Sequence, residues 1–339
     1  MKNLMNLVVL SAVLAVVGCV KANDVKVGQD EVVGESGSMR VSVCHDSPAV
    51  RSIADYQRLL TEESAVHKVN VLVFDRQSER LEQSATMTSL SEECMFDLPV
   101  GEKLVYAIVN GPDVSRVQNV DQLLALKDDL SLRNSSQQGF VMSGSQVCKV
   151  STGEVAKPEI VVARQVARVE LRSVKCNVAA QYGSMTVDCA FLANAYSVQT
   201  LSGAVSSMVN VGGYADQQKL NPIGFNGIEG ACPEYMYRGL DVMLMLNESM
   251  SDPVYMYCQP NAGGEYTCMY LLATIGGEKY YYRVPFDKGI EANTSYIVDA
   301  VITNLGAPLP PDGVIQKGEI EVTITIEDWA VGDQYHAEF

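Results

Sequence analysis

The chain has 339 residues and carries 25 Lys and Arg residues against 41 Asp and Glu residues, a formal net charge of −16. This charge excludes nucleic acid as the main partner, because phosphate binding needs a basic face. Hydrophobic residues make up 47% and charged residues 19%, which excludes a disordered chain, and the length is that of two domains.

The first residues are typical of an export signal. Lys2 is followed by a mostly apolar run from Leu4 to Val17, which is too short to span a bilayer and suits a signal peptide. The run ends in Val16-Val17-Gly18-Cys19, which resembles a bacterial lipobox, so we expect residues 1–18 to be a lipoprotein signal peptide and Cys19 to receive a lipid. The alternative is an ordinary buried Cys after a secretory signal.

A polar, aperiodic stretch over residues 20–38 predicts a tether, and strand signals dominate after it. Met39, Val41 and Val43 alternate with polar residues and predict a short, half-buried strand. The segment 52–65 is either a short helix or an exposed loop. Residues 69–73 and 104–110 predict two further strands.

The strongest helix signal covers residues 119–130, where Asn119 is a candidate N-cap and Gln122 the reciprocal residue of a capping box. Strands are expected around residues 140–142 and 148–150. Pro158 opens a long β-rich run, near which we place a domain boundary.

Two hairpins are expected in the second half, one joining 174–178 to 185–191 and the other joining 254–258 to 266–272. Their strands carry two pairs of cysteines placed symmetrically about the turns, Cys176 with Cys189 and Cys258 with Cys268. Opposed residues on neighbouring strands are within disulfide reach. Disulfides in an oxidising compartment and four free, buried thiols are equally compatible with this pattern.

The last strand is the clearest element of the chain. Ile320, Val322, Ile324 and Ile326 alternate with Glu and Thr residues, which predicts a strand with one buried and one exposed face. With one helix and many short strands, the chain is expected to be mainly β, with two β-sandwich domains of transthyretin-like or Greek-key type and one or two short helices. We expect these domains at residues 52–160 and 161–339.

No catalytic or metal site is expected. The three histidines, His45, His67 and His336, belong to no pattern with a nucleophile and an acid, and the Cys44-His45 pair lacks zinc-ligand spacing. Glycine pairs lack the context of a phosphate loop, so no cofactor is expected.

The chain nevertheless resembles a known family. A lipobox, a short first strand and an Arg in the next loop are followed in order by VNVLVFD, YAIVNGP, FVMSG, VARVEL, NTSYIVDAVITNLG and GEIEVTITIEDW. This order resembles the type V pilin (fimbrillin) family, the fimbrial subunits of Bacteroides-type bacteria, over nearly the whole chain.

The resemblance implies a mechanism of assembly. Subunits of this family are exported as outer-membrane lipoproteins, and an Arg-specific protease then removes the lipid together with the first strand. By this resemblance residues 19–51 are a propeptide, Arg51 is the cleavage position, and Met39, Val41 and Val43 belong to the removable strand. Arg40 is a poorer cleavage candidate because it lies inside that strand.

The C-terminal strand of the next subunit would fill the vacated groove, so the implied partners are other copies of the chain and related subunits. The donor residues would be Ile320, Val322, Ile324, Ile326 and Trp329, with 334–339 as a second donor segment. A role in adhesion and an unidentified surface receptor are part of this expectation, and the membrane is contacted only through the lipid.

Two alternatives remain from the sequence. The chain could be a fimbrial anchor or accessory subunit, or a surface lipoprotein that binds glycans. The second rests on the run Tyr280-Tyr281-Tyr282, which could stack on sugars but also suits a strand.

Overall fold

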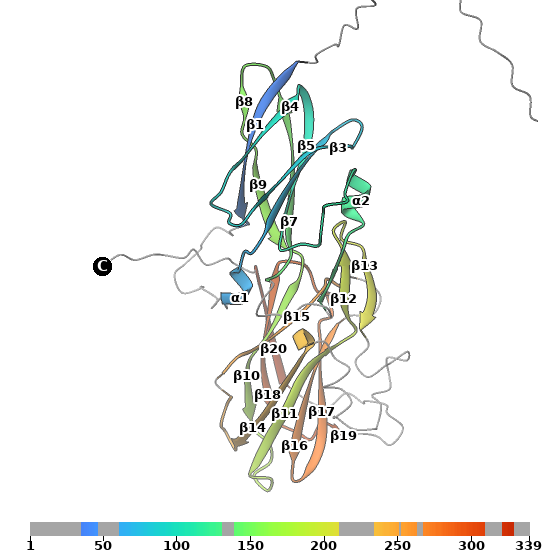
Figure 1. The fold of residues 1–339 in the computed structure, drawn as a ribbon. Coiled ribbons are helices and arrows are strands. Elements are labelled where there is room, and N and C mark those ends of the chain that lie inside the picture. Colours follow the sequence, from blue (N-terminus) through green and yellow to red (C-terminus); the bar gives the residue numbers. More distant parts are fainter. Residues whose placement is uncertain are drawn as a thin grey trace, which may run out of the picture. The chain divides into compact units, whose positions relative to one another are not determined.

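The computed structural model describes residues 35–46, 61–130, 139–209, 234–250, 252–262, 267–308 and 321–328. All of these belong to one compact unit, Glu35–Phe339. The elements are almost entirely strands, with two short α-helices, α1 (Thr61–Ser64) and α2 (Val120–Leu124), and a 3₁₀ turn, η3 (Glu234–Met236) (Figure 1). The prediction of a mainly β fold with one or two short helices is confirmed.

The first half of the chain forms an eight-stranded sheet. Its strand order is β3-β2-β5-β7-β9-β1-β4, with β8 paired to β1. The strands are β1 (Ser36–His45), β2 (Val69–Asp75), β3 (Leu81–Met87), β4 (Cys94–Pro99), β5 (Gly101–Val109), β7 (Met142–Val150), β8 (Val155–Ala156) and β9 (Glu159–Arg164).

This sheet folds over one apolar core. Met39 and Val41 of β1 lie in the same buried cluster as Val71 of β2 and Val105 of β5. The two ends of the sheet also meet, because the Gln83 side chain of β3 donates a hydrogen bond of 2.7 Å to the Asp97 carbonyl of β4. The sheet therefore encloses its core as a sandwich does.

Strand β2 is buried on both faces. Val71 and Val73 face the core just described, whereas Leu72 and Phe74 pack into a second cluster with Leu123 of α2. Helix α2 covers this outer face, which explains the continuous apolar run of β2.

Asn119 caps α2 as predicted, but the Gln122 side chain binds the amide before the N-cap instead of the N-cap itself, and the predicted length of the helix is wrong. The Asn119 side chain accepts a 2.9 Å hydrogen bond from the Gln122 amide, and the Gln122 side chain accepts one of 2.9 Å from the Gln118 amide. The helix ends at Leu124, and Lys127–Asp129 forms strand β6. Pairing of β6 with a strand from the second half replaces the remaining helical turns.

The second half of the chain forms two sheets over a shared core. One sheet has the order β15-β10-β18-β20 and the other the order β14-β11-β16-β17-β19. The first consists of β10 (Ala167–Cys176), β15 (Val254–Cys258), β18 (Thr294–Ile302) and β20 (Glu321–Asp328), and the second of β11 (Ser184–Ala193), β14 (Tyr237–Met245), β16 (Cys268–Ile275), β17 (Glu278–Pro285) and β19 (Ala307–Pro308).

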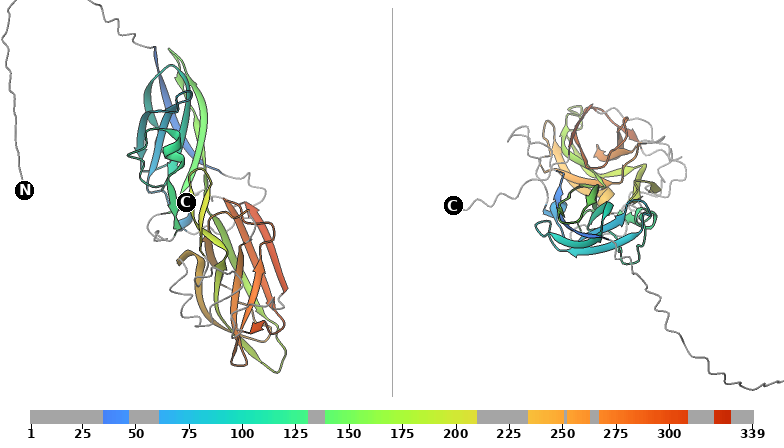
Figure 2. Two further views of the ribbon diagram at one scale, coloured as in Figure 1. Left: turned by 90° about the vertical axis from the view of Figure 1, so that its right-hand side faces the viewer. Right: turned by 90° about the horizontal axis from the view of Figure 1, so that it is seen from above.

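A small third sheet contains strands from both halves of the sequence. Its order is β13-β12-β6, with β12 at Ala195–Thr200 and β13 at Val205–Val209. In Figure 2 the yellow strands of this small sheet lie between the blue-to-green strands of the first half and the orange-to-red strands of the second half. The boundary at residue 160 stays a prediction, although the two larger cores divide near it.

Both predicted hairpins are wrong. Strand β10 pairs with β15 and β18, and β11 pairs with β14 and β16, so β10 and β11 lie in different sheets. Likewise β15 pairs with β10, whereas β16 pairs with β17 through a tight turn at Gly276-Gly277. Both glycines have positive φ, as such a hairpin turn requires. Each predicted turn is instead a crossing between the two layers of a sandwich.

Candidate functional site

The first strand occupies an interior position of its sheet. β1 pairs antiparallel with β4 over Ser36–Val41 and parallel with β9 over Ser42–His45 (Figure 1). It therefore has a neighbouring strand on each side, although it is the first strand among the described residues. Its removal would leave unpaired backbone groups on β4 and β9, which is a template for strand addition.

The side chains of β1 fill the core beneath it. Met39 and Val41 are 0% exposed and Val43 is 3% exposed. Met39 lies opposite Phe96 of β4, which is also buried, and the predicted strand with its alternation is thus confirmed. Burial of these side chains contributes roughly 1.5–3 kcal/mol each, so the vacated place would be a strongly apolar groove.

Past Val43, the end of β1 is polar on its inner face. His45 lies opposite Val162 of β9, and Arg164 is the next residue of β9 on that face. Burial, together with the positive charge of Arg164, lowers the pKa of His45 to about 4. The Nδ1 atom of His45 is buried and has no hydrogen-bond partner among the described residues. A neutral imidazole therefore occupies a positively charged site.

A buried ionic cluster lies next to this end and holds α1. The Glu63 carboxylate accepts hydrogen bonds from Arg168 at 3.1 Å and from the Tyr257 hydroxyl at 2.7 Å. The Glu63 carbonyl accepts two more from Arg164, at 3.1 and 3.2 Å, and Arg168 also donates to Ser295 at 2.9 Å. Glu63 and Arg168 are both 0% exposed. This cluster binds the segment that follows β1 in the sequence to β10, β15 and β18.

Burial also affects the acid–base properties of the cluster. It lowers the pKa of the Arg164 guanidinium to about 10, although the charge of Glu63 raises it in part. Burial, followed by the charge of Glu63, raises the pKa of Tyr257.

The last described strand lies at the edge of its sheet. β20 pairs antiparallel with β18 from Val301↔Glu321 to Thr294↔Asp328, and no other described strand pairs with it. Val322 and Ile324 are half-buried and pack against the core, whereas Thr323 is exposed. The predicted strand is confirmed over Glu321–Asp328 and its alternation over residues 322–324, while Ile320 and Trp329 lie outside the described residues.

Several predicted positions cannot be placed. Cys19, Arg51 and the segment 334–339 also lie outside the described residues. The structure brings together Met39, Val41 and Val43 in one core, but β20 of the same chain belongs to a different sheet. The strand predicted to be removed and the strand predicted to be the donor therefore lie in different sheets.

The cysteines of the second half are free thiols. Cys176, Cys189, Cys258 and Cys268 are all buried and form no disulfide. Cys176 and Cys189 end up in different sheets, as do Cys258 and Cys268, because the two hairpins do not form. The disulfide alternative is therefore wrong, and these thiols pack in the core. Burial raises the pKa of Cys189 and of Cys258 to about 12, which keeps both thiols protonated and unreactive.

The tyrosine run belongs to the core and offers no exposed platform for sugars. Tyr281 is 1% and Tyr282 is 0% exposed, and the Tyr282 hydroxyl donates a 2.8 Å hydrogen bond to the Asn304 carbonyl. The run of three tyrosines therefore packs in a strand and does not support a glycan-binding role.

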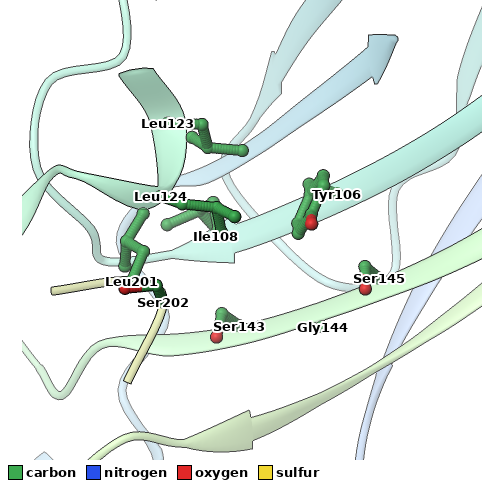
Figure 3. A pocket seen from close by; sticks show the side chains of 9 residues that line it. All are labelled: Tyr106, Ile108, Leu123, Leu124, Ser143, Gly144, Ser145, Leu201 and Ser202. Carbon is green, nitrogen blue, oxygen red and sulfur yellow. The ribbon is translucent and has the colours of Figure 1, made fainter. Parts of the chain in front are cut away.

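A cavity of about 280 Å³ lies on the outer face of β5 and β7, beside α2 (Figure 3). Tyr106 and Ile108 line it from β5, and Ser143 and Ser145 from β7. Its lining carries no charged side chain. Within the described ranges no group of three or more His, Cys, Asp or Glu residues could hold a metal ion, and no helix is long and apolar enough to cross a membrane.

A mainly β chain with an enclosed first strand and an alternating last strand at a sheet edge has the architecture expected of a type V pilin. No protein-family model and no curated protein sequence matches the chain at a significant level. Solved structures do match it, and those with TM-scores above 0.5 include adhesion and fimbrial proteins of Parabacteroides distasonis and Porphyromonas gingivalis.

Three of these structures are informative. A fimbrilin (FimA) from Porphyromonas gingivalis has a TM-score of 0.62 at 12% identity, covering 88% of this chain and 98% of the other. A candidate cell adhesion protein from Parabacteroides distasonis also has a TM-score of 0.62, at 15% identity, covering 86% and 97%. A C-terminally truncated tip fimbrial protein, Mfa3, from P. gingivalis has a TM-score of 0.51 at 16% identity, covering 87% and 100%. The predicted resemblance is confirmed for the fold.

Sequence reasoning missed the polar end of β1 and the buried ionic cluster. His45, Glu63 and Arg164 are far apart in the sequence and share no motif. The local signals were Arg164, which follows an apolar run, and Arg168, which precedes Val169. A charged residue beside apolar residues does not distinguish a buried ion pair from an exposed one.

Proposed function

We propose that this protein is a structural subunit of a cell-surface fimbrium that polymerises by exchange of β-strands. The observation that carries the proposal is the position of β1, which lies between β4 and β9 and buries Met39, Val41 and Val43 although it precedes the other described strands. The fold shared with fimbrial proteins supports the same role. The role is structural and adhesive, not catalytic.

Export and maturation complete the proposal. The precursor is exported as a lipoprotein anchored in the outer membrane through Cys19, and an Arg-specific protease cuts after Arg51, between β1 and α1. Residues 19–51, including β1, then leave. The buried cluster around Glu63 supports this step, because it holds α1, the first described element after the cleavage position, against the body of the subunit.

The strand containing Ile320, Val322, Ile324 and Ile326 of a second copy then fills the groove, together with Trp329 or the segment 334–339. Four apolar side chains at roughly 1.5–3 kcal/mol each are available before the costs of ordering are subtracted. A head-to-tail contact of this kind does not close on itself, so repetition builds a fibre. The surplus of acidic residues opposes lateral clumping of such fibres.

Brief trypsin treatment of the purified precursor tests this function, with N-terminal mass spectrometry and electron microscopy as the two readouts. We expect a new N-terminus at Ser52 followed by growth of fibres. An Arg51→Ala variant should stay uncut and monomeric, whereas an Arg40→Ala variant, changed inside β1, should still be cut and polymerise. A subunit that is cut after Arg51 and stays monomeric would refute the proposal for a shaft subunit.

Deletion of residues 334–339 tests the second donor segment. The shortened precursor should fold and be cut normally but form no fibres. Fibres of unchanged length and stability would exclude this segment from the mechanism.

A further inference from the structure

Gly37 of β1 occupies a place that no larger residue fits. It lies opposite Leu98 of β4, and the backbone just after β7 passes close beside it. A Cβ atom at this position would overlap the carbonyl oxygen of Ser151 and would lie 2.8 Å from Cγ1 of Val150. Because the first of these contacts is with backbone, rotation of a side chain cannot relieve it. A strand that takes the place of β1 therefore needs a glycine at this point.

The residues after Gly37 complete the requirement. Met39, Val41 and Val43 are buried, and they stand at the second, fourth and sixth positions after the glycine. Alternation puts all of them on one face of the strand. A replacement strand must therefore carry a glycine followed by apolar residues at these three spacings.

One glycine near the C-terminus meets this requirement. The glycines of residues 305–339 are Gly306, Gly313, Gly318 and Gly332. Gly318 is followed at the required spacings by Ile320, Val322 and Ile324, whereas the other three are followed at the second or fourth position by proline, lysine or glutamine. Gly318 and Ile320 lie outside the described residues, and their match to β1 is one of sequence.

We propose that the last strand of one copy enters the groove of the next in the direction of β1, with Gly318 in the place of Gly37. Ile320, Val322 and Ile324 then fill the places of the three buried side chains of β1. Gly318 is the residue that sets the register. This inference rests on the proposed function and adds to it the alignment of the exchanged strand.

The side chains of this register are close in size to those that they replace. Val322 takes the place of a valine, Ile320 that of a methionine, and Ile324 that of a valine with one carbon group fewer. Exchanges that nearly conserve volume are the ones that a packed core tolerates best. The core vacated by β1 is therefore refilled without large gaps.

The register also places Ile326 where His45 lies in the precursor. The Nδ1 atom of His45 is buried and has no hydrogen-bond partner among the described residues. An apolar side chain at this place removes the cost of burying an unsatisfied polar atom. The exchange therefore favours the assembled state at this end of the groove.

Registers displaced by two residues lose the match. One of them places Ile320 at the site of Gly37, where its Cβ would overlap the neighbouring backbone. The other places Gln316 there, with the same overlap, and puts Gly318 in the buried place of Met39, which leaves a cavity.

A strand that runs in the opposite direction is also excluded by its sequence. In the reverse direction Gly332 is followed at the fourth position by Asp328, and Gly318 is followed at the second by Gln316. Either strand would bury a polar or charged side chain in an apolar core, which is costly. A donor that runs as β1 does also repeats the antiparallel pairing with β4 and the parallel pairing with β9.

The outer face of the exchanged strand is acidic, but this opposes the register only weakly. Glu321 takes the place of Arg40, which lies 3.7 Å from Glu93, and Glu319 comes to lie opposite Asp97. These positions are exposed, so the like-charge contacts are screened by water and salt.

Two glycine substitutions test the register by their opposite effects. Gly318→Ala should leave the precursor folded and cut, but should raise the critical concentration for fibre growth roughly tenfold or more, because its Cβ meets backbone in the next copy. Gly37→Ala should lower the melting temperature of the precursor and leave the critical concentration unchanged, because residue 37 leaves with the propeptide. Gly313→Ala, which lies before the exchanged stretch, is the matched control and should change neither quantity.

The outcomes of this comparison are distinct. A Gly318→Ala subunit that is cut and polymerises as the wild type does would overturn the register. A Gly37→Ala subunit whose fibres are weakened as strongly as those of Gly318→Ala would instead show that β1 is retained, which refutes the proposed function.

Cysteine cross-linking measures the register directly. Met95 is 54% exposed and lies opposite Arg40, whose place Glu321 takes. After cleavage and fibre growth, the full-length Met95→Cys/Glu321→Cys variant should give disulfide-linked ladders on non-reducing gels, because opposed residues of neighbouring strands are within disulfide reach. Variants that combine Met95→Cys with Glu319→Cys or Thr323→Cys report the displaced registers and should not cross-link. The single Met95→Cys variant measures reaction with native thiols.

The cross-linking result also separates this inference from the proposed function. Ladders only in a displaced pair would overturn the register, and fibres without ladders in any pair would overturn the entry of this strand in the direction of β1. Absence of fibres from the cleaved wild-type protein would instead refute the proposed function.

Discussion

A Val41→Ala substitution should destabilise the precursor and leave the fibre unaffected. Val41 is 0% exposed and lies in the core that β1 shares with β2 and β5. The change removes two buried carbon groups, about 1.6 kcal/mol at ~0.8 kcal/mol each. The cavity that remains raises the loss to about 2 kcal/mol or more. A loss of 2 kcal/mol corresponds to a change of roughly 30-fold in the ratio of folded to unfolded precursor.

Urea unfolding of the uncut precursor measures the first effect, and heating of fibres in detergent measures the second. Val71→Ala is the matched control, because Val71 is also 0% exposed in the same core but belongs to β2, which is retained. It should weaken both precursor and fibre. Fibres of the Val41→Ala variant that dissociate at a lower temperature than wild-type fibres would show that β1 stays in the assembled subunit. That result would refute strand exchange at this position.

Three further variants and conditions probe the sites around β1. Glu63→Gln should lower the free energy of unfolding by about 3 kcal/mol, because it breaks a buried ion pair, as urea titration would show. Lowering the pH from 6.5 toward 4 should loosen β1, measured by hydrogen exchange, because its docked state keeps His45 neutral with a pKa of about 4. Above pH 6.5 His45 is neutral whether β1 is docked or released, so docking costs nothing there. As the pH falls below 6.5, released His45 binds a proton that docked His45 does not, and the docked state of β1 loses stability. Gly144→Ala should cost about 1–3 kcal/mol in urea unfolding, because a Cβ there would overlap the Val161 carbonyl.

Each of these expectations has a control. Arg172→Met removes an ion pair with Asp299 that is partly exposed, so a loss below ~1 kcal/mol is expected, and an equal loss for Glu63→Gln would contradict its assigned role. His67 is exposed, so His67→Gln should leave the pH dependence of β1 unchanged, whereas His45→Gln should flatten it. Undiminished stability of the Gly144→Ala variant would show that β7 and β9 separate easily.

Much of the fold was predictable because alternation of apolar residues is a local property. The strands at 39–44, 69–73 and 104–110 were predicted correctly for this reason. The pairing partners cannot be predicted in this way, because strands that are neighbours in the sequence need not be neighbours in the sheet. β10 and β11 are buried on most of their positions, so either face could pack, and only competition among all strands decides which pairs form.

The candidate site divides in the same way. The apolar residues of β1 and β20 were recognisable from their periodicity, whereas the polar residues at the end of β1 were not. His45, Glu63 and Arg164 meet only because β1, α1 and β9 converge, and the free energy of a buried charge depends on the partners that folding supplies. Burial of the four cysteines as free thiols likewise depends on sheet membership.

By itself, the sequence of this protein determined a mainly β chain with an apolar first strand and an alternating last strand, and it predicted an exported lipoprotein. Those features are set by the order of apolar and polar residues along short segments. Only the tertiary structure decided that β1 is enclosed between β4 and β9, that β20 lies at a sheet edge, and that a positive charge is buried where β1 ends. These depend on contacts between residues far apart in the chain, whose energies exist only when the whole unit has folded.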